Sequence, residues 1–99
     1  MDAAVALGAP VVELHTGKYC DVAGAERAAE LQRLVEAAQY GSRAGLRINA
    51  GHGLNYENLP AFLAAVPHLD TLNIGHSIVA RAVLVGMEQA VREMKSLLA

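Results

Sequence analysis

Short apolar runs alternate along the chain with longer segments in which apolar residues recur at helical spacing. The run 11–15 is rich in β-branched side chains, which favours a buried strand. Four apolar residues of a longer segment recur three to four positions apart and predict an amphipathic helix over 25–43: Leu31, Leu34, Val35 and Ala38. The same criteria predict two further strands, over 46–50 and 69–74, and four further helices, over 1–7, 58–66, 77–85 and 86–98.

Residues that begin or end helices support these boundaries. Gly8, shortly before Pro10, is a common stop signal for the first helix. Asn58 is placed to cap the helix over 58–66, and Pro60 is tolerated in a first turn.

The resulting order, α-β-α-β-α-β-α, is typical of α/β proteins with parallel strands and right-handed crossovers. Parallel sheets are normally covered on both faces or closed into a barrel of eight strands. Three strands would leave two sheet edges unpaired. The chain is therefore either a compact three-stranded sandwich or a piece of a larger fold. We favour the second interpretation, in which residues 1–99 form one partial (β/α)8 barrel domain with three parallel strands.

Composition narrows the class of protein. Hydrophobic residues make up 54% of the chain and aromatic residues only 4%, so the core is expected to be mainly aliphatic. Eight basic residues face ten acidic ones without a basic run, which argues against nucleic-acid or membrane-surface partners. The single Cys20 excludes an internal disulfide and fits a cytoplasmic location. No apolar stretch approaches the roughly 20 residues of a membrane helix, and no targeting segment is recognisable.

Each predicted strand is followed by a polar turn that contains glycine and histidine: His15-Thr16-Gly17, Gly51-His52-Gly53 and Gly75-His76-Ser77. The carboxyl ends of parallel strands share one face of such folds, where active sites lie. Glycine lets backbone amides approach a ligand, and the last two turns of a barrel commonly bind phosphate. If these strands are the last two of a barrel, the second and third turns are predicted to bind phosphate, with Ser77 as an additional donor.

Two side chains are candidates for proton transfer. An imidazole exchanges protons near neutral pH, so His52 is the candidate acid/base; the alternative is that it simply packs in its turn. Glu13 lies within an apolar strand, where an unpaired carboxylate is unfavourable. It either points into a barrel mouth toward substrate or a cation, or pairs with Arg47 on the neighbouring strand.

The remaining polar residues give weaker signals. His15 closes a predicted buried strand, which favours a packing role. His76 is expected to contribute its backbone N–H. No histidines have the spacing of common zinc motifs, so no metal site is predicted. Cys20 has no CxxC partner and is interpreted as a bystander.

Three segments strongly resemble the last three βα units of the pyridoxine 5′-phosphate synthase family: VVELHTGKYCD, GLRINAGHGLNYEN and LDTLNIGHSIVARAVLVGMEQAVREM. The resemblance runs from about Ala6 to the end of the chain, and its NAGHGLNY and LNIGHSI stretches are quite specific. It implies a (β/α)8 barrel with extra helices, a homo-octamer, and no metal or organic cofactor. The implied reaction condenses 1-deoxy-D-xylulose 5-phosphate with 3-amino-2-oxopropyl phosphate to pyridoxine 5′-phosphate, inorganic phosphate and water.

The resemblance also implies roles for individual residues. The proton-donor histidine of the family's AGHGL motif falls at His52, while Gly53 and the pair Gly75-His76 match positions that bind the aminoketone phosphate. The glutamate of the HTG-bearing strand, an active-site residue, falls at Glu13.

The family's N-terminal half, with an Asn-x-Asp-His motif, substrate-binding arginines and further acid/base groups, has no counterpart in this chain. We therefore expect the chain alone to be inactive. Two alternatives stay open: a module that binds phosphate esters without turnover, and an inactive truncated fragment.

Overall fold

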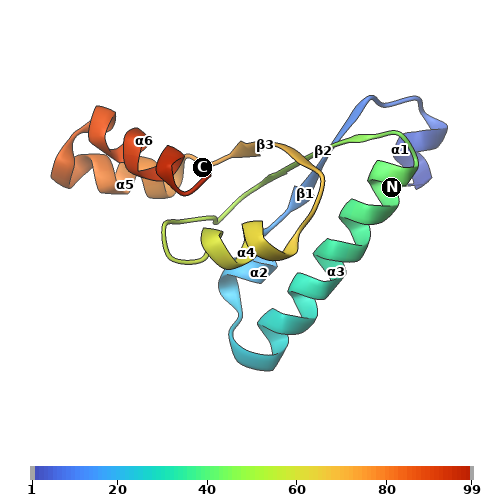
Figure 1. Ribbon diagram of the computed structural model, residues 1–99, viewed down its shortest axis with the longest axis horizontal. Coiled ribbons are helices and arrows are strands. Elements are labelled where there is room, and N and C mark those ends of the chain that lie inside the picture. The colour runs from blue at the N-terminus through green and yellow to red at the C-terminus, as the bar shows by residue number, and fades with distance from the viewer. Residues whose placement is uncertain (1, 99) are drawn as a thin grey trace.

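A computed structural model describes residues 2–98 as a three-stranded parallel sheet flanked by helices (Figure 1). The elements follow in the order α1 (Asp2–Ala6), β1 (Val11–His15), α2 (Gly17–Asp21), α3 (Gly24–Arg43), β2 (Arg47–Gly51), α4 (Leu59–Ala65), β3 (Leu69–Asn73), α5 (His76–Val85) and α6 (Met87–Ser96). The strand order is β1-β2-β3, with both pairs parallel. The predicted α/β class is confirmed, and each observed strand lies within one residue of its predicted bounds.

The two faces of the sheet differ in polarity because side chains alternate along each strand. Leu14 and Ile48 point to a face that is buried beneath helices. The opposite face carries polar residues in register, with Glu13 opposite Asn49 and Asn49 opposite Thr71. Glu13 and Thr71 are exposed and Asn49 is half-buried, so no layer of residues 2–98 covers this face.

Side chains from three helices pack on the apolar face. Phe62 of α4 is fully buried beside Tyr19 of α2, with ring centroids 5.7 Å apart. The Tyr19 hydroxyl donates a hydrogen bond to the carbonyl of Asn58 at 2.8 Å. Leu34 of α3 is buried in the same cluster. This core holds α2, α3 and α4 against the sheet and thereby orients the turns that follow β1 and β2.

The fold is open at both sides of the sheet. Within the described residues, β1 and β3 each pair with a strand on one side only. Helices α5 and α6 extend away from the sheet (Figure 1), and none of the residues from His76 to Val85 is buried. The radius of gyration is 14.3 Å, above the about 13 Å expected for a compact domain of this length. These features fit a piece of a larger fold and exclude a sandwich covered on both faces by the described residues.

The entry into α4 differs from its predicted form. The side chain of Asn58 makes no capping bond to the helix; its Oδ1 accepts the N–H of Asn55 at 2.8 Å. Asn55 instead supplies the turn, because its Oδ1 accepts the N–H groups of Glu57 and Asn58, each at 2.8 Å. Pro60 lies in the first turn as predicted.

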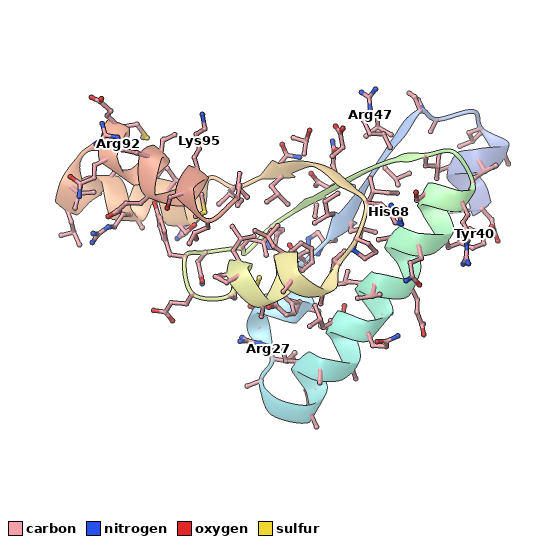
Figure 2. All side chains as sticks on the ribbon, in the orientation of Figure 1. Arg27, Tyr40, Arg47, His68, Arg92 and Lys95 are labelled. Carbon is pink, nitrogen blue, oxygen red and sulfur yellow. The ribbon has the colours of Figure 1, made fainter. Side chains whose placement is uncertain are left out.

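The ion pair considered between Glu13 and Arg47 is not formed. The register places Arg47 opposite Val11, two positions before Glu13. Arg47 points away from α3 (Figure 2), and its Nε lies 3.9 Å from a carboxylate oxygen of Asp70. Glu13 is therefore left on the uncovered polar face, without a cation from β2.

Glu30 provides a pH-dependent contribution to stability. This buried side chain of α3 accepts a hydrogen bond from Nε of Arg33 at 3.1 Å, and that bond lowers the pKa of the Glu30 carboxyl. Because the pKa of this carboxyl is lower in the folded than in the unfolded chain, its ionised form stabilises the fold at pH values above the unfolded pKa of about 4.3. This contribution to the free energy of unfolding is lost as pH falls through the folded-state pKa.

Replacement of Glu30 by glutamine is therefore expected to lower the free energy of unfolding by about 0.5–1 kcal/mol at pH 7 and by much less at pH 3. Urea unfolding at both pH values measures the difference. Glu36→Gln on the same helix is the control, because that side chain is exposed and pairs with no cation within residues 2–98. An effect of Glu30→Gln that does not change with pH would contradict this account.

Candidate active site

The turns that follow the three strands meet at one end of the sheet and line an open pocket of about 530 Å³. The five residues to which the family resemblance gives catalytic or phosphate-binding roles all line it: Glu13, His52, Gly53, Gly75 and His76. Ser77, predicted as an additional donor, lines it too, whereas Gly51 of the second turn does not. Parallel strands bring these turns together because their carboxyl ends share one edge of the sheet. The structure thus gathers the candidates in one place, and their chemical roles stay predictions.

The turn after β2 has an unusual backbone. His52 has a φ of 90° and Gly53 a φ of 79°, a backbone conformation that residues other than glycine seldom adopt. A Cβ at Gly53 would lie 2.9 Å from Cβ of Cys20, so glycine is needed there for space as well as for conformation. Strained backbone of this kind is concentrated at functional sites. The turn leaves the His52 side chain exposed at the pocket wall.

His15 stacks on His52. Their ring centroids lie 4.4 Å apart, with an angle of 26° between the planes. Gly17 makes this possible, because a Cβ there would lie 2.6 Å from Cε1 of His15 and 2.8 Å from Cδ2 of His52. The His15 side chain is exposed and Leu14 is the buried neighbour, so His15 packs against His52 at the surface and not in the core. The structural role inferred for His15 from sequence stays a prediction.

Glu13 reaches across the polar face toward β3. Its Oε1 accepts a hydrogen bond from Nδ2 of Asn73 at 2.5 Å. Gly51 lies between them on β2, where a Cβ would come within 3.1 Å of that oxygen and 2.9 Å of the Asn73 carbonyl. On the same face, Oδ1 of Asn49 is buried without a hydrogen-bond partner among the described residues. Glu13 is therefore the exposed acceptor of the two, while the Asn49 oxygen is enclosed by the described residues.

Helix α5 begins at the third turn. Gly75 precedes the helix and His76 is its first residue, so the N–H groups of the first turn have no carbonyl partners within the helix. Such groups favour an anion. The Ser77 hydroxyl donates to the carbonyl of Leu54 at 2.9 Å, which ties the third turn to the second. Ser77 is thus engaged within the protein, and the free donors at this turn belong to the backbone.

Other candidate chemistry is weak in the described part of the chain. Burial raises the pKa of the Cys20 thiol, against smaller opposing effects of Asn58 and Arg27, which disfavours a thiolate nucleophile. No three His, Cys, Asp or Glu side chains within residues 2–98 gather closely enough to hold a metal ion. No described helix combines the length and apolar character needed to cross a membrane.

The chain as a whole matches one known family. Residues 1–99 match the family described as "Pyridoxal phosphate biosynthesis protein PdxJ". The chain belongs to this family. A pyridoxine 5′-phosphate synthase of Akkermansia muciniphila is 57% identical to it over 95 residues. The synthases of Idiomarina loihiensis and Thioalkalivibrio sulfidiphilus are 54% and 56% identical over 99 and 98 residues.

The chain spans about 40% of the length of these relatives. The three alignments cover 96%, 99% and 97% of the chain but 39%, 40% and 39% of the respective relatives. The family resemblance carried by the three strand–turn segments is thereby confirmed. An open sheet of three parallel strands, in a chain of this coverage, agrees with a partial (β/α)8 barrel.

Sequence reasoning missed two features of the pocket. The stack of His15 on His52 depends on the absence of a side chain at Gly17, and the HTG triplet by itself does not indicate it. The contact between Glu13 and Asn73 joins strands that are separated by β2. The glycine at the end of β2 was the available signal, because it leaves room between its two neighbours.

Proposed function

We propose that this chain is the catalytic-face segment of a pyridoxine 5′-phosphate synthase. In this proposal the complete protein condenses 1-deoxy-D-xylulose 5-phosphate with 3-amino-2-oxopropyl phosphate, releasing pyridoxine 5′-phosphate, inorganic phosphate and water. The observation that carries it is the convergence of Glu13, His52, Gly53 and the pair Gly75-His76 on one pocket. Membership of the family supports the assignment.

His52 is proposed as the proton donor. Ring closure joins an amine to carbonyl groups and expels water and phosphate, so protons must reach the departing oxygens. The His52 imidazole is exposed at the pocket wall, where a substrate can reach it. The stacked ring of His15 limits its rotation, which keeps the donor in one orientation.

The phosphate of the aminoketone is proposed to bind between the second and third turns. Gly53 allows close approach to the backbone, and the first-turn amides of α5 at Gly75-His76 supply unpaired donors. The hydrogen bond between Ser77 and Leu54 fixes the spacing of the two turns before substrate arrives. A phosphate held there would present the attached carbon chain to His52 and Glu13.

Glu13 is proposed to act as a charged group toward the substrate, and Glu13→Gln tests the charge. Glutamine keeps an oxygen acceptor for Asn73, so the contact across Gly51 is retained while the negative charge is lost. We expect kcat to fall by about 10²- to 10³-fold, as for other groups that stabilise developing charge. Glu57→Gln is the matched control, because Glu57 is exposed in the loop beyond the pocket. Unchanged kcat in Glu13→Gln would remove Glu13 from the active site.

The pocket lacks a wall on the uncovered face of the sheet, so the test of function needs the rest of a barrel. A chimeric synthase provides it: the segment of the Akkermansia muciniphila relative that aligns with this chain is replaced by residues 1–99. We expect this chimera to form pyridoxine 5′-phosphate from the two substrates. A folded chimera that binds phosphate esters without forming product would favour a binding module, and one that does neither would overturn the proposal.

Assembly and location belong to the same proposal. We propose that the complete protein binds phosphorylated small molecules, acts in the cytoplasm and forms a homo-octamer, as the family resemblance implies. Apolar side chains of α5 support a larger assembly, because Val79, Val83 and Leu84 are 55%, 82% and 79% exposed.

A further inference from the structure

The hydroxyl of Thr16 is directed at the backbone of the second turn. Thr16 is fully buried, and its Oγ1 lies 2.7 Å from the carbonyl oxygen of Gly51 and 2.6 Å from that of His52. A hydroxyl has one proton, so it donates to one of these oxygens at a time or shares the proton between them. The N–H of Thr16 also donates to the carbonyl of Gly51 at 3.0 Å. The first turn thus hydrogen-bonds the carbonyls of both peptide groups that flank His52, that between Gly51 and His52 and that between His52 and Gly53.

This use of a threonine is unusual for its position in the chain. Thr16 immediately precedes α2, where a threonine side chain commonly accepts a hydrogen bond from the first turn of the helix. No such bond is formed here; the side chain turns to the neighbouring strand instead. The Thr16 hydroxyl therefore stabilises the conformation of the second turn and does not cap α2.

The backbone at His52, which the Thr16 hydroxyl contacts, has a conformation that requires stabilising contacts. His52 has a φ of 90°, which persists in a non-glycine residue only where surrounding contacts enforce it. The His52 carbonyl accepts from the Thr16 hydroxyl, which is shared with the Gly51 carbonyl, and from the Cys20 thiol of α2 at 3.7 Å. Rotation of this peptide would swing the imidazole out of its stack with His15.

We propose that Thr16 is a positioning residue for the reaction, whose hydroxyl locks the His52 peptide and so aims the imidazole into the pocket. This inference rests on the proposed function of His52. Thr16 does not touch substrate, so its loss should affect the chemical step more than substrate binding. A displacement of a catalytic group by about 1 Å is enough to lower the rate about 10²-fold.

The test compares three variants in the chimeric synthase. Thr16→Val removes the hydroxyl at nearly constant volume, and Thr16→Ser keeps it. Tyr19→Phe is the matched control, because it removes another buried hydroxyl that donates to a backbone carbonyl, at Asn58, without contacting His52. We expect Thr16→Val to lower kcat by about 10- to 100-fold with KM nearly unchanged. Thr16→Ser and Tyr19→Phe should retain most of kcat.

Thermal unfolding and the imidazole NMR signals of His52 are measured on the same proteins. Shifted His52 signals in Thr16→Val, with a folded protein, would support the proposal. If Thr16→Val and Tyr19→Phe lose stability and kcat alike, or if Thr16→Val keeps the kcat of the parent, Thr16 is only structural and the proposal fails. An inactive parent chimera would instead overturn the proposed function, so the two failures are distinguishable.

Discussion

In the chimeric synthase, His52→Asn is expected to lower kcat by about 10²- to 10⁴-fold, the contribution typical of a positioned general acid or base. Asparagine removes the imidazole but, like histidine, is among the residues that best tolerate positive φ. The turn at a φ of 90° can therefore keep its backbone. The His52 side chain is exposed, so no core contact is lost. Steady-state kinetics with both substrates measures the effect, and thermal unfolding checks the fold.

His68→Asn is the matched control for this substitution. His68 also has a positive φ, 66°, and is exposed, but it precedes β3 at the opposite end of the strands (Figure 2). As a surface change away from the site, it is expected to alter kcat by no more than about twofold. An unchanged kcat in His52→Asn, or an equal loss in both variants, would contradict the assignment of His52 as proton donor.

The largest effect on stability is expected from Phe62→Ala. Phe62 is fully buried between α4 and α2, against the ring of Tyr19. Truncation removes most of a buried ring and leaves a cavity, so the free energy of unfolding should fall by about 3–5 kcal/mol. Urea unfolding of the chimera, followed by circular dichroism, measures the change.

Phe62→Leu distinguishes the loss of buried apolar volume from the loss of the aromatic ring alone. Leucine keeps a large apolar side chain and is expected to lower the free energy of unfolding by only about 1.5 kcal/mol or less. Equal, small effects of both variants would show that the contact between α4 and α2 does not support the fold. Because Tyr19 lies three residues after Thr16, loss of this contact should also loosen the first turn of the site.

Local patterns predicted the strands well because each strand is short and lies between glycine or proline signals. Helix α2 was missed, since Gly17–Asp21 is too short for periodicity to reveal. It is held by burial of Tyr19 against Phe62, a contact distant in sequence. Asn58 was assigned as a cap by its position, but Asn55 makes the turn, and nothing in residue type distinguishes two asparagines so close together.

The hydrogen-bond partner of Glu13 could not be predicted from local sequence patterns. Its pairing with Arg47 was plausible from charge, yet the register places Arg47 opposite Val11. The observed partner, Asn73, comes from a strand that is not adjacent, and Gly51 lets the contact pass over the strand between them. Register and the spacing of side chains across a sheet follow from pairing of whole strands, which a single segment does not specify.

The sequence by itself determined the α/β class, the three parallel strands, the family and the five candidate residues that meet at the pocket. These depend on local periodicity, on turn residues and on the rule that parallel strands end at one edge. Only the tertiary structure decided the stack of His15 on His52 and the hold of Thr16 on the His52 peptide. Those contacts join residues more than thirty positions apart, and their distances follow from backbone conformation in two turns brought together by the sheet.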